Sequence, residues 1–109
     1  MPARTSSSTS TVGRRLRLAR ERAGLPQDRL GVLAGLEESS SSARISRYES
    51  GVHEPSLGFT ESLAKVLGVP AAYFFCSDDR LAEIILAYAE MSEAQRQALH
   101  RKAVELAGH

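Results

Sequence analysis

The sequence predicts an all-α fold. In each long segment, apolar residues recur three or four positions apart, which is the spacing of a buried helix face. No segment alternates polar and apolar residues for long enough to form a strand. Aromatic residues are few, with three Phe, three Tyr and no Trp. The core must therefore consist mostly of Leu, Ile, Val and Ala, which suits packed helices.

Size and composition limit what the protein can be. At 109 residues the chain has room for one small domain with one core. Cys76 is the only cysteine, so we expect neither an internal disulfide nor a zinc site, and no cofactor. No apolar run approaches the roughly 20 residues of a membrane span, and there is no signal peptide. We therefore expect a cytoplasmic protein without a membrane partner.

The charge is unevenly distributed along the chain. Residues 1–56 carry nine Arg against six Asp or Glu, whereas residues 57–109 carry five basic and seven acidic residues. The first half therefore favours an anionic partner. Residues 1–10 are rich in Ser and Thr and contain little to bury, so a disordered N-terminal arm is expected there.

The first expected helix is capped by Ser10 or Thr11 and ends before Gly24. Arg20 lies on its apolar face and needs a buried partner, because an unpaired charge in a core is costly. Glu49 is the expected partner. The predicted buried face comprises Val12, Leu16, Ala19, Arg20 and Ala23.

Pro26 opens a second helix, because a proline at the first helical position loses no hydrogen bond. Gln27 and Asp28 lie in its first turn, where free N–H groups and the helix dipole favour an anion. We expect this end to contact a phosphate. The residues expected to be buried are Leu30, Leu33 and Ala34.

The third expected helix, which ends at Gly51, carries the strongest functional signal. Its outward side presents Arg44 and Arg47, two neighbouring guanidinium groups that repel each other unless an anion lies near them. A slim, basic helix rich in hydrogen-bond donors suits the DNA major groove. The alternative is an ordinary solvated helix face. Its inward side carries Ile45, Tyr48 and Glu49, and its short hydroxyl donors are Ser41, Ser42 and Ser46.

Four further helices are expected. Ser56 caps the first of them, and the apolar run Val69–Phe75 forms a short helix that closes the core. Ser77, Asp78 and Asp79 cap a helix that runs to about Glu90, and a capping box at Ser92–Gln95 starts the last helix. The helix after Ser56 is expected to bury Leu57, Thr60, Leu63, Ala64 and Leu67. The last two helices carry Leu81, Ile84, Ile85 and Tyr88 on one face, and then Ala98, Leu99, Ala103 and Leu106.

These motifs together resemble the phage-repressor helix-turn-helix family, the Cro/cI-like or XRE regulators. The resemblance depends on an Arg in the first helix, a Gln opening the second, and Arg-Ile-Ser-Arg-Tyr-Glu-Ser-Gly in the third. It covers about residues 12–75. It implies a five-helix lambda-repressor-like DNA-binding domain, here residues 11–76, with two additional C-terminal helices in residues 77–109.

The resemblance also implies roles for individual residues in binding double-stranded DNA. Gln27 would hold a phosphate, and Arg47 would reach base edges, with guanine O6 and N7 as the acceptors. Ser50 would hold the phosphate beyond the helix end, and Arg20 with Glu49 would form the buried ion pair. The remaining residues implied to face the groove or the DNA backbone are Ser41, Ser42, Ala43, Arg44 and Ser46.

The turn before the third helix departs from the family pattern. Eight residues, Glu37 to Arg44, stand where the family usually has fewer. The extra residues must lengthen either the turn or the N-terminus of the third helix. Any of the serines 39–42 could cap that helix, so its start stays open by two or three residues. Glu37 and Glu38 are expected to point away from DNA, because phosphates repel them.

The C-terminal helices are the expected dimerisation element, since two copies are needed to read a palindromic operator. The alternative is that they fold back onto the core. The predicted function is sequence-specific transcription regulation, with repression by a homodimer. A protein-interaction module or antitoxin with the same fold remains the alternative. An enzyme is not expected, because the histidines lack catalytic neighbours, and no small-molecule effector is evident.

Overall fold

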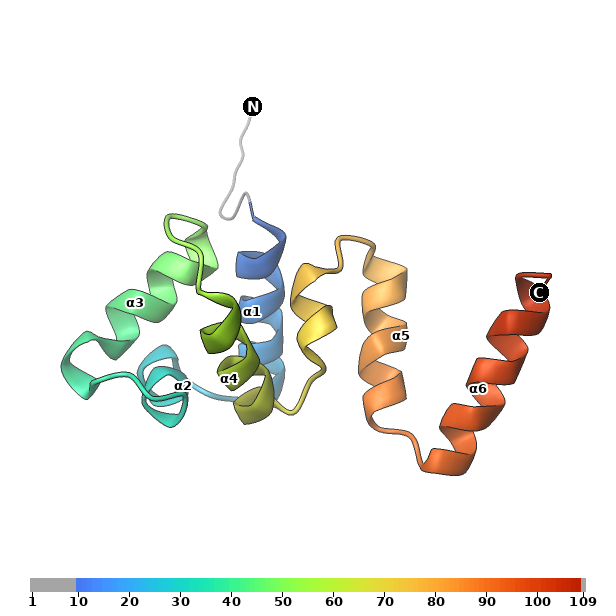
Figure 1. The fold of residues 1–109 in the computed structure, drawn as a ribbon. Coiled ribbons are helices and arrows are strands. Elements are labelled where there is room, and N and C mark those ends of the chain that lie inside the picture. The colour runs from blue at the N-terminus through green and yellow to red at the C-terminus, as the bar shows by residue number, and fades with distance from the viewer. Residues whose placement is uncertain (1–9, 109) are drawn as a thin grey trace.

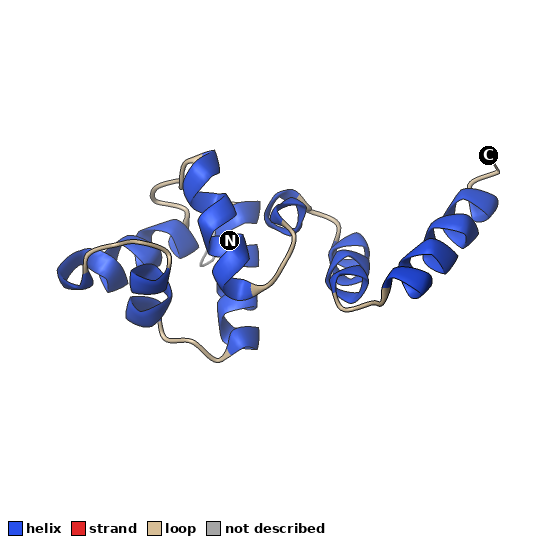
Figure 2. Cartoon of the chain, turned by 60° about the horizontal axis from the view of Figure 1, so that its bottom comes forward, coloured by secondary structure: helices blue, strands red, loops and turns tan. Residues whose placement is uncertain are grey.

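The computed structural model describes residues 10–108, which are entirely helical apart from their turns and loops. The expected disordered arm therefore lies, except for Ser10, outside the described residues. The helices are arranged as Figures 1 and 2 show, with bounds α1 Thr11–Ala23, α2 Gln27–Leu33, α3 Glu38–Ser50, α4 Leu57–Leu67, the 3₁₀ helix η2 Ala71–Phe75, α5 Asp79–Ala89 and α6 Glu93–Leu106. Within these residues, no helix is both long enough and apolar enough to cross a membrane.

Side-chain caps start four of the helices. The Ser10 hydroxyl accepts the Gly13 N–H at 2.7 Å and Ser56 accepts the Phe59 N–H at 3.1 Å. Asp78 caps α5, and Ser92 forms the expected capping box with Gln95 at the start of α6. Each cap satisfies an N–H group that has no partner within the helix.

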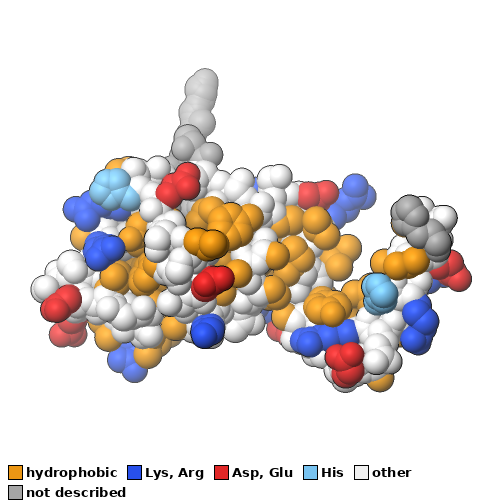
Figure 3. All heavy atoms as spheres, in the orientation of Figure 1, with side chains coloured by type: hydrophobic (Ala, Val, Ile, Leu, Met, Phe, Trp, Pro, Cys, Tyr) orange, Lys and Arg blue, Asp and Glu red, His pale blue; other side chains and the backbone are white. Residues whose placement is uncertain are grey.

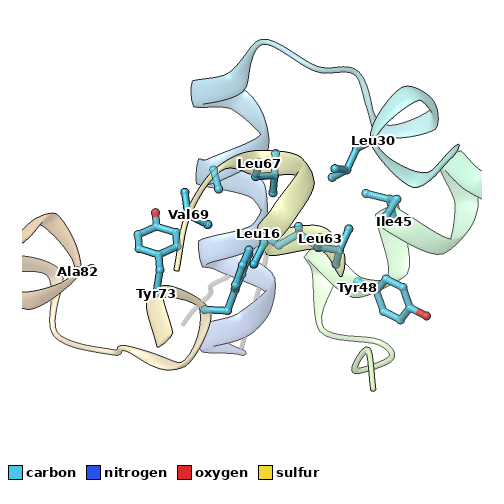
Figure 4. Packing of buried hydrophobic residues seen from close by; sticks show 12 residues of the cluster. Leu16, Leu30, Ile45, Tyr48, Leu63, Leu67, Val69, Tyr73 and Ala82 are labelled. Atoms are coloured by element: carbon cyan, nitrogen blue, oxygen red, sulfur yellow. The ribbon is translucent and has the colours of Figure 1, made fainter. Parts of the chain in front are cut away.

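The core lies where α1 to α4 and η2 meet. Helix α2 packs on α3, α1 packs on α3, α4 and η2, and α4 also packs on α2 and η2. Figure 4 shows the buried apolar side chains of these elements directed toward one another. Leu16, Leu30, Ile45 and Phe74 are fully buried. The core is thus largely aliphatic, as expected from the composition.

Three residues expected in the core are exposed. Ala23 and Leu33 are the last residues of α1 and α2, and Leu57 is the first residue of α4. Leu33 keeps 48% and Leu57 65% of its accessible surface. Each lies on the predicted face of its helix but in a terminal turn, beyond the edge of the core. Periodicity identifies the face of a helix but not how far along the helix the core extends.

Arg15 is buried, although the pattern of α1 did not predict this. Only 3% of its surface is accessible. Its Nε donates to the Cys76 carbonyl at 2.7 Å, its Nη2 donates to Asp79 at 2.9 Å, and its guanidinium lies over the Tyr73 ring at 5.5 Å. These contacts attach the N-terminal end of α5 to α1.

The two C-terminal helices behave differently. Helix α5 packs on η2, buries Ala82 against the core, and is also attached to α1 through an ion pair between Arg22 and Glu90. Helix α6 has no buried residue and extends away from the other helices (Figures 1 and 2). Its first turn is tied back by Arg96, which donates to the Tyr88 and Ala89 carbonyls at 2.9 Å. The alternative, that these helices fold back onto the core, therefore holds for α5 only.

Candidate nucleic-acid interface

Helices α2 and α3 are joined by the short turn 34–37. The Leu36 N–H donates to the Gly31 carbonyl at 2.8 Å, and the Leu36 side chain packs against the core. Helix α3 starts two residues later, with Glu37 as its N-cap residue and without a side-chain cap. The expectation that a serine caps α3 is therefore wrong, because Leu36 fixes the chain before the serines are reached. The extra residues extend α3 at its N-terminus.

Ser41 does not face outward, and its predicted role in DNA binding is corrected here. Its side chain is fully buried, and its hydroxyl donates to the Asp28 carbonyl at 2.7 Å. It lies against Gly31, where a Cβ atom would come within 1.9 Å of the Ser41 Oγ. Ser41 precedes Ile45 by four residues and Tyr48 by seven, so helical period would have placed it inward once the start of α3 was known.

The remaining predicted residues of α3 lie on one exposed side of that helix. Ser42 and Ser46 are exposed, and so are Arg44 and Arg47. Figure 3 shows basic side chains gathered over this part of the molecule. Glu37 and Glu38 are exposed as well, beside the N-terminus of α3. The exposed residues predicted to meet DNA are Ser42, Ala43, Arg44, Ser46, Arg47 and Ser50.

The arginines of α1 and α3 differ in their partners. Every arginine of α1 forms an ion pair with a carboxylate: Arg14 and Arg15 with Asp79, Arg17 with Glu21, Arg20 with Glu49 and Arg22 with Glu90. Within residues 10–108, neither Arg44 nor Arg47 forms such a pair. Two adjacent, unneutralised guanidinium groups on one exposed helix face favour an anionic partner.

Arg20 and Glu49, the pair expected from the sequence, are in contact beneath this surface. Their side chains are 14% and 7% exposed, and the Arg20 Nε to Glu49 Oε2 distance is 2.5 Å. Arg20 also donates to the Leu25 carbonyl at 2.9 Å. The hydrogen bond to Glu49 raises the pKa of the Arg20 guanidinium, although burial opposes this. The pair joins the end of α1 to the inward side of α3.

Gln27, the predicted phosphate ligand, extends this network. Its Nε2 donates to Glu49 Oε1 at 3.1 Å, and its Oε1 accepts the Ser42 hydroxyl at 3.4 Å. It lies at a polar hollow of about 350 Å³ whose other lining residues include Arg17, Ser46 and Ser50. Gln27 is therefore half-buried and held against α3 rather than freely extended.

The outward side chains of α3 differ in their hydrogen bonds. The Arg44 Nη2 donates to the Tyr48 hydroxyl at 2.9 Å, whereas no hydrogen bond joins the Arg47 side chain to the rest of the described chain. The Ser50 hydroxyl donates to the Arg47 carbonyl at 3.2 Å. Arg47 thus has its full set of guanidinium donors available, which is what a bidentate contact with a base edge requires.

Known proteins resemble this chain over the same region. The family model described as a helix-turn-helix domain matches residues 11–73. Two uncharacterized HTH-type transcriptional regulators, from Sinorhizobium medicae and Rhizobium meliloti, are each 31% identical to it over 64 residues. That stretch is 59% of this chain and 43% of each relative. The chain therefore spans less than half the length of these relatives.

A solved structure is similar over a larger part of the chain. The crystal structure of transcriptional regulator BswR is 43% identical in sequence, with a TM-score of 0.81, over 85% of this chain and 92% of that one. Residues 1–76 make up about 70% of this chain, so the similarity includes part of the C-terminal helices. With a helix-turn-helix model that covers more than half of its length, the chain belongs to the helix-turn-helix family of transcriptional regulators.

Proposed function

We propose that this protein is a sequence-specific DNA-binding transcription regulator whose α3 enters the major groove. The observation that supports this best is the exposed side of α3, where Arg44 and Arg47 lack carboxylate partners while every arginine of α1 is paired. The opposite side of α3 is held against α1 and α2 through Ile45, Ser41 and Glu49. A helix held rigidly on one side can present its other side in a constant register.

The proposed roles follow from position. Arg47 contacts base edges, with guanine O6 and N7 as the matching acceptors. Ser42, Ala43 and Ser46 lie along the groove. Gln27, the first residue of α2, and Ser50, the last residue of α3, contact backbone phosphates, and these contacts fix the register of the helix without reading sequence. Arg44 contacts the DNA backbone at the edge of the groove that α3 occupies.

The proposal includes a homodimer that acts as a repressor on a palindromic operator. Two copies related by a two-fold axis would place their α3 helices in successive major grooves about 34 Å apart. The support comes from α5 and α6, whose exposed Leu81, Ile84 and Tyr88 face Leu99 and Leu106 across an apolar groove of about 470 Å³. A second copy would cover this surface. Occupation of an operator by the dimer would then exclude polymerase.

The test begins with selection of DNA from a random library by the wild-type protein. Fluorescence anisotropy then compares wild type with Arg47→Ala, and with Arg101→Ala as a matched control on the exposed side of α6. Arg47→Ala should lose about 1–3 kcal/mol of discrimination against mismatched bases, whereas the control should bind like wild type. Failure to enrich any sequence, with no binding at low salt, would contradict the proposal.

The apolar groove also supports a second candidate, a regulator that binds a different protein, as an antitoxin does. Light scattering of the purified protein at micromolar concentration separates the two. A dimer supports self-association through α5 and α6. A monomer that still binds DNA supports a different protein partner for the groove.

A further inference from the structure

Arg96 spans the corner between α5 and α6. Its Nε donates to the Tyr88 carbonyl and its Nη2 donates to the Ala89 carbonyl, each at 2.9 Å. Its guanidinium also lies over the Tyr88 ring, 4.9 Å from the ring centre. Because Ala89 is the last residue of α5 and Arg96 lies in the first turn of α6, one side chain holds the two helices together at this corner.

These bonds satisfy carbonyl groups at the C-terminal end of α5. The last carbonyls of a helix have no partner within it, and the helix dipole favours a cation at that end. The Tyr88 carbonyl accepts the Met91 N–H at 3.1 Å as well as the Arg96 Nε–H, which its two lone pairs allow. Within residues 10–108, Arg96 forms no ion pair with a carboxylate. Its charge is therefore directed at the end of α5.

Little else fixes the direction of α6 in the described part of the chain. No residue of α6 is buried, and α6 is not among the helices that pack closely on one another. Behind the corner lies a hollow of about 740 Å³, which Arg96 and Tyr88 line together with Glu61 and Lys65 of α4. Helix α4 therefore does not support the corner from that side. Figures 1 and 2 show α6 projecting from the corner.

Helix α6 turns as one rigid body about this corner. The capping box of Ser92 and Gln95 fixes its first turn, and its 14 residues make it about 21 Å long. A change of about 20° at the corner would move its far end by about 7 Å, roughly two base-pair steps of 3.4 Å. Small changes of this angle therefore reach the scale on which half-site spacing is measured.

We propose that Arg96 is a positioning residue for operator recognition, which sets the half-site spacing that the dimer accepts by fixing the angle between α5 and α6. This inference rests on the proposed function, because it requires two copies joined through these helices. A second copy that covers the apolar groove contacts both α5 and α6. The angle between the two helices then decides where the second copy lies relative to α3.

The test measures affinity for DNAs that carry the selected half-sites at the selected spacing, and at spacings one and two base pairs shorter or longer. Wild type should prefer the selected spacing by about tenfold or more, because a fixed dimer matches one separation of major grooves. In Arg96→Ala this preference should fall to about threefold or less, and affinity for the selected spacing should fall about fivefold, because the angle is no longer preorganised. Affinity for a single half-site should equal that of wild type.

Two further variants separate the bonds of Arg96 from its charge. Arg96→Lys keeps the charge but cannot form the planar fork of two hydrogen bonds, so it should resemble Arg96→Ala. Arg101→Ala removes an exposed arginine of α6 and should keep the spacing preference of wild type. Light scattering should show a dimer for each variant, and circular dichroism should show the helix content of wild type.

The outcomes separate this inference from the proposed function. A dimeric Arg96→Ala with the spacing preference of wild type would overturn the inference and leave the proposed function intact. A monomeric Arg96→Ala would also overturn it, because Arg96 would then be required for dimer formation rather than for its geometry. A wild type that is a monomer, or that enriches no DNA, would overturn the dimer or the DNA binding of the proposed function and this inference with it.

The angle itself is measured by electron-electron resonance between two nitroxide labels on one chain. The labels are attached through Glu83→Cys on α5 and Arg101→Cys on α6, in a Cys76→Ser background, and each labelled chain is diluted with unlabelled protein. With Arg96 present the distribution of distances should be narrow. Addition of Arg96→Ala should at least double its width, and an unchanged width would overturn the inference.

Discussion

At the residue scale, the two sides of α3 perform different tasks. The inward side carries a charged residue, Glu49, that accepts hydrogen bonds from both Arg20 and Gln27. The outward side carries Arg47, whose side chain has no hydrogen bond to the rest of the described chain. Removal of an inward residue should therefore affect stability, and removal of an outward one should affect binding alone.

Glu49→Ala should lower the free energy of unfolding by about 3 kcal/mol, because it leaves Arg20 buried without its carboxylate. The bond from Arg20 to the Leu25 carbonyl remains, which places the effect at the lower end of the range for broken buried pairs. Urea denaturation followed by circular dichroism measures the loss. Arg47→Ala is the control and should unfold like wild type. Equal losses in the two variants would show that the inward and outward sides are wrongly assigned.

The close approach of α2 to α3 depends on Gly31. An alanine Cβ there would lie 1.9 Å from Ser41 Oγ and 3.1 Å from Ser41 Cβ. Gly31→Ala should therefore destabilise the protein by about 1–3 kcal/mol through overpacking. Ser41→Ala alone should cost about 1 kcal/mol, for its hydrogen bond to Asp28.

The double variant should be more stable than the sum of the single losses predicts, since removal of the hydroxyl relieves the shortest contact. A double-mutant cycle in urea measures this coupling, which we expect to be about 1 kcal/mol. If the losses in stability of the two single variants simply add, then α2 and α3 move apart in Gly31→Ala, and the added Cβ atom does not press against Ser41.

At the element scale, α5 is attached to α1 by charge as well as by packing. Asp79 accepts hydrogen bonds from Arg14 and Arg15, both at 2.9 Å. The Arg14 guanidinium, followed by that of Arg15, holds the pKa of the Asp79 carboxyl below its usual range. The Asp79 carboxylate is exposed, whereas the Arg15 guanidinium is buried. Asp79 therefore stabilises the protein chiefly as the partner of this buried guanidinium.

Asp79→Asn should lower the melting temperature at pH 7. Because the folded-state pKa of Asp79 is lowered, its stabilising effect is present above the ordinary carboxyl pKa of about 4 and is lost as the pH falls below that value. The difference in melting temperature between wild type and Asp79→Asn should therefore shrink from pH 5 to pH 2. Glu83→Gln, an exposed carboxylate on the same helix, is the control and should show no such convergence. A constant difference would argue against the ion pair.

At the scale of the whole molecule, the chain consists of a packed unit and a projecting helix. The core occupies α1 to η2, α5 covers one side of it, and α6 extends outward with no buried residue. An isolated helix of α6's 14 residues is only marginally stable in water. The proposed dimer would give α6 a partner and bring two copies of α3 to one DNA duplex.

Ile84→Asp should abolish dimerisation without unfolding the protein, because half of the Ile84 surface is already exposed in the single chain. A charge placed in the apolar groove would lose its hydration when a second copy covered it. Light scattering should report a monomer, while the melting temperature measured at low concentration should match wild type. Affinity for a full operator should fall at least tenfold and affinity for a half-site should not change. A dimer that persists in Ile84→Asp would remove this groove from the proposal.

The sequence by itself determined the order of the helices, the caps at Ser56 and Ser92, the partnership of Arg20 with Glu49, and the outward position of Arg47. These follow from local rules: helical period, capping chemistry and the cost of an unpaired buried charge. The helix-turn-helix family was likewise identifiable from the residues of α2 and α3. Periodicity also predicted the apolar faces of α5 and α6.

Tertiary structure alone decided the rest. The start of α3, and hence the burial of Ser41, depended on Leu36 packing and on the closeness of α2 at Gly31. The burial of Arg15 depended on η2 and α5 returning to α1. Each of these features is a contact between segments that are distant in the sequence. The pattern of residues along the chain does not show which distant segments will meet, so it could not predict these contacts.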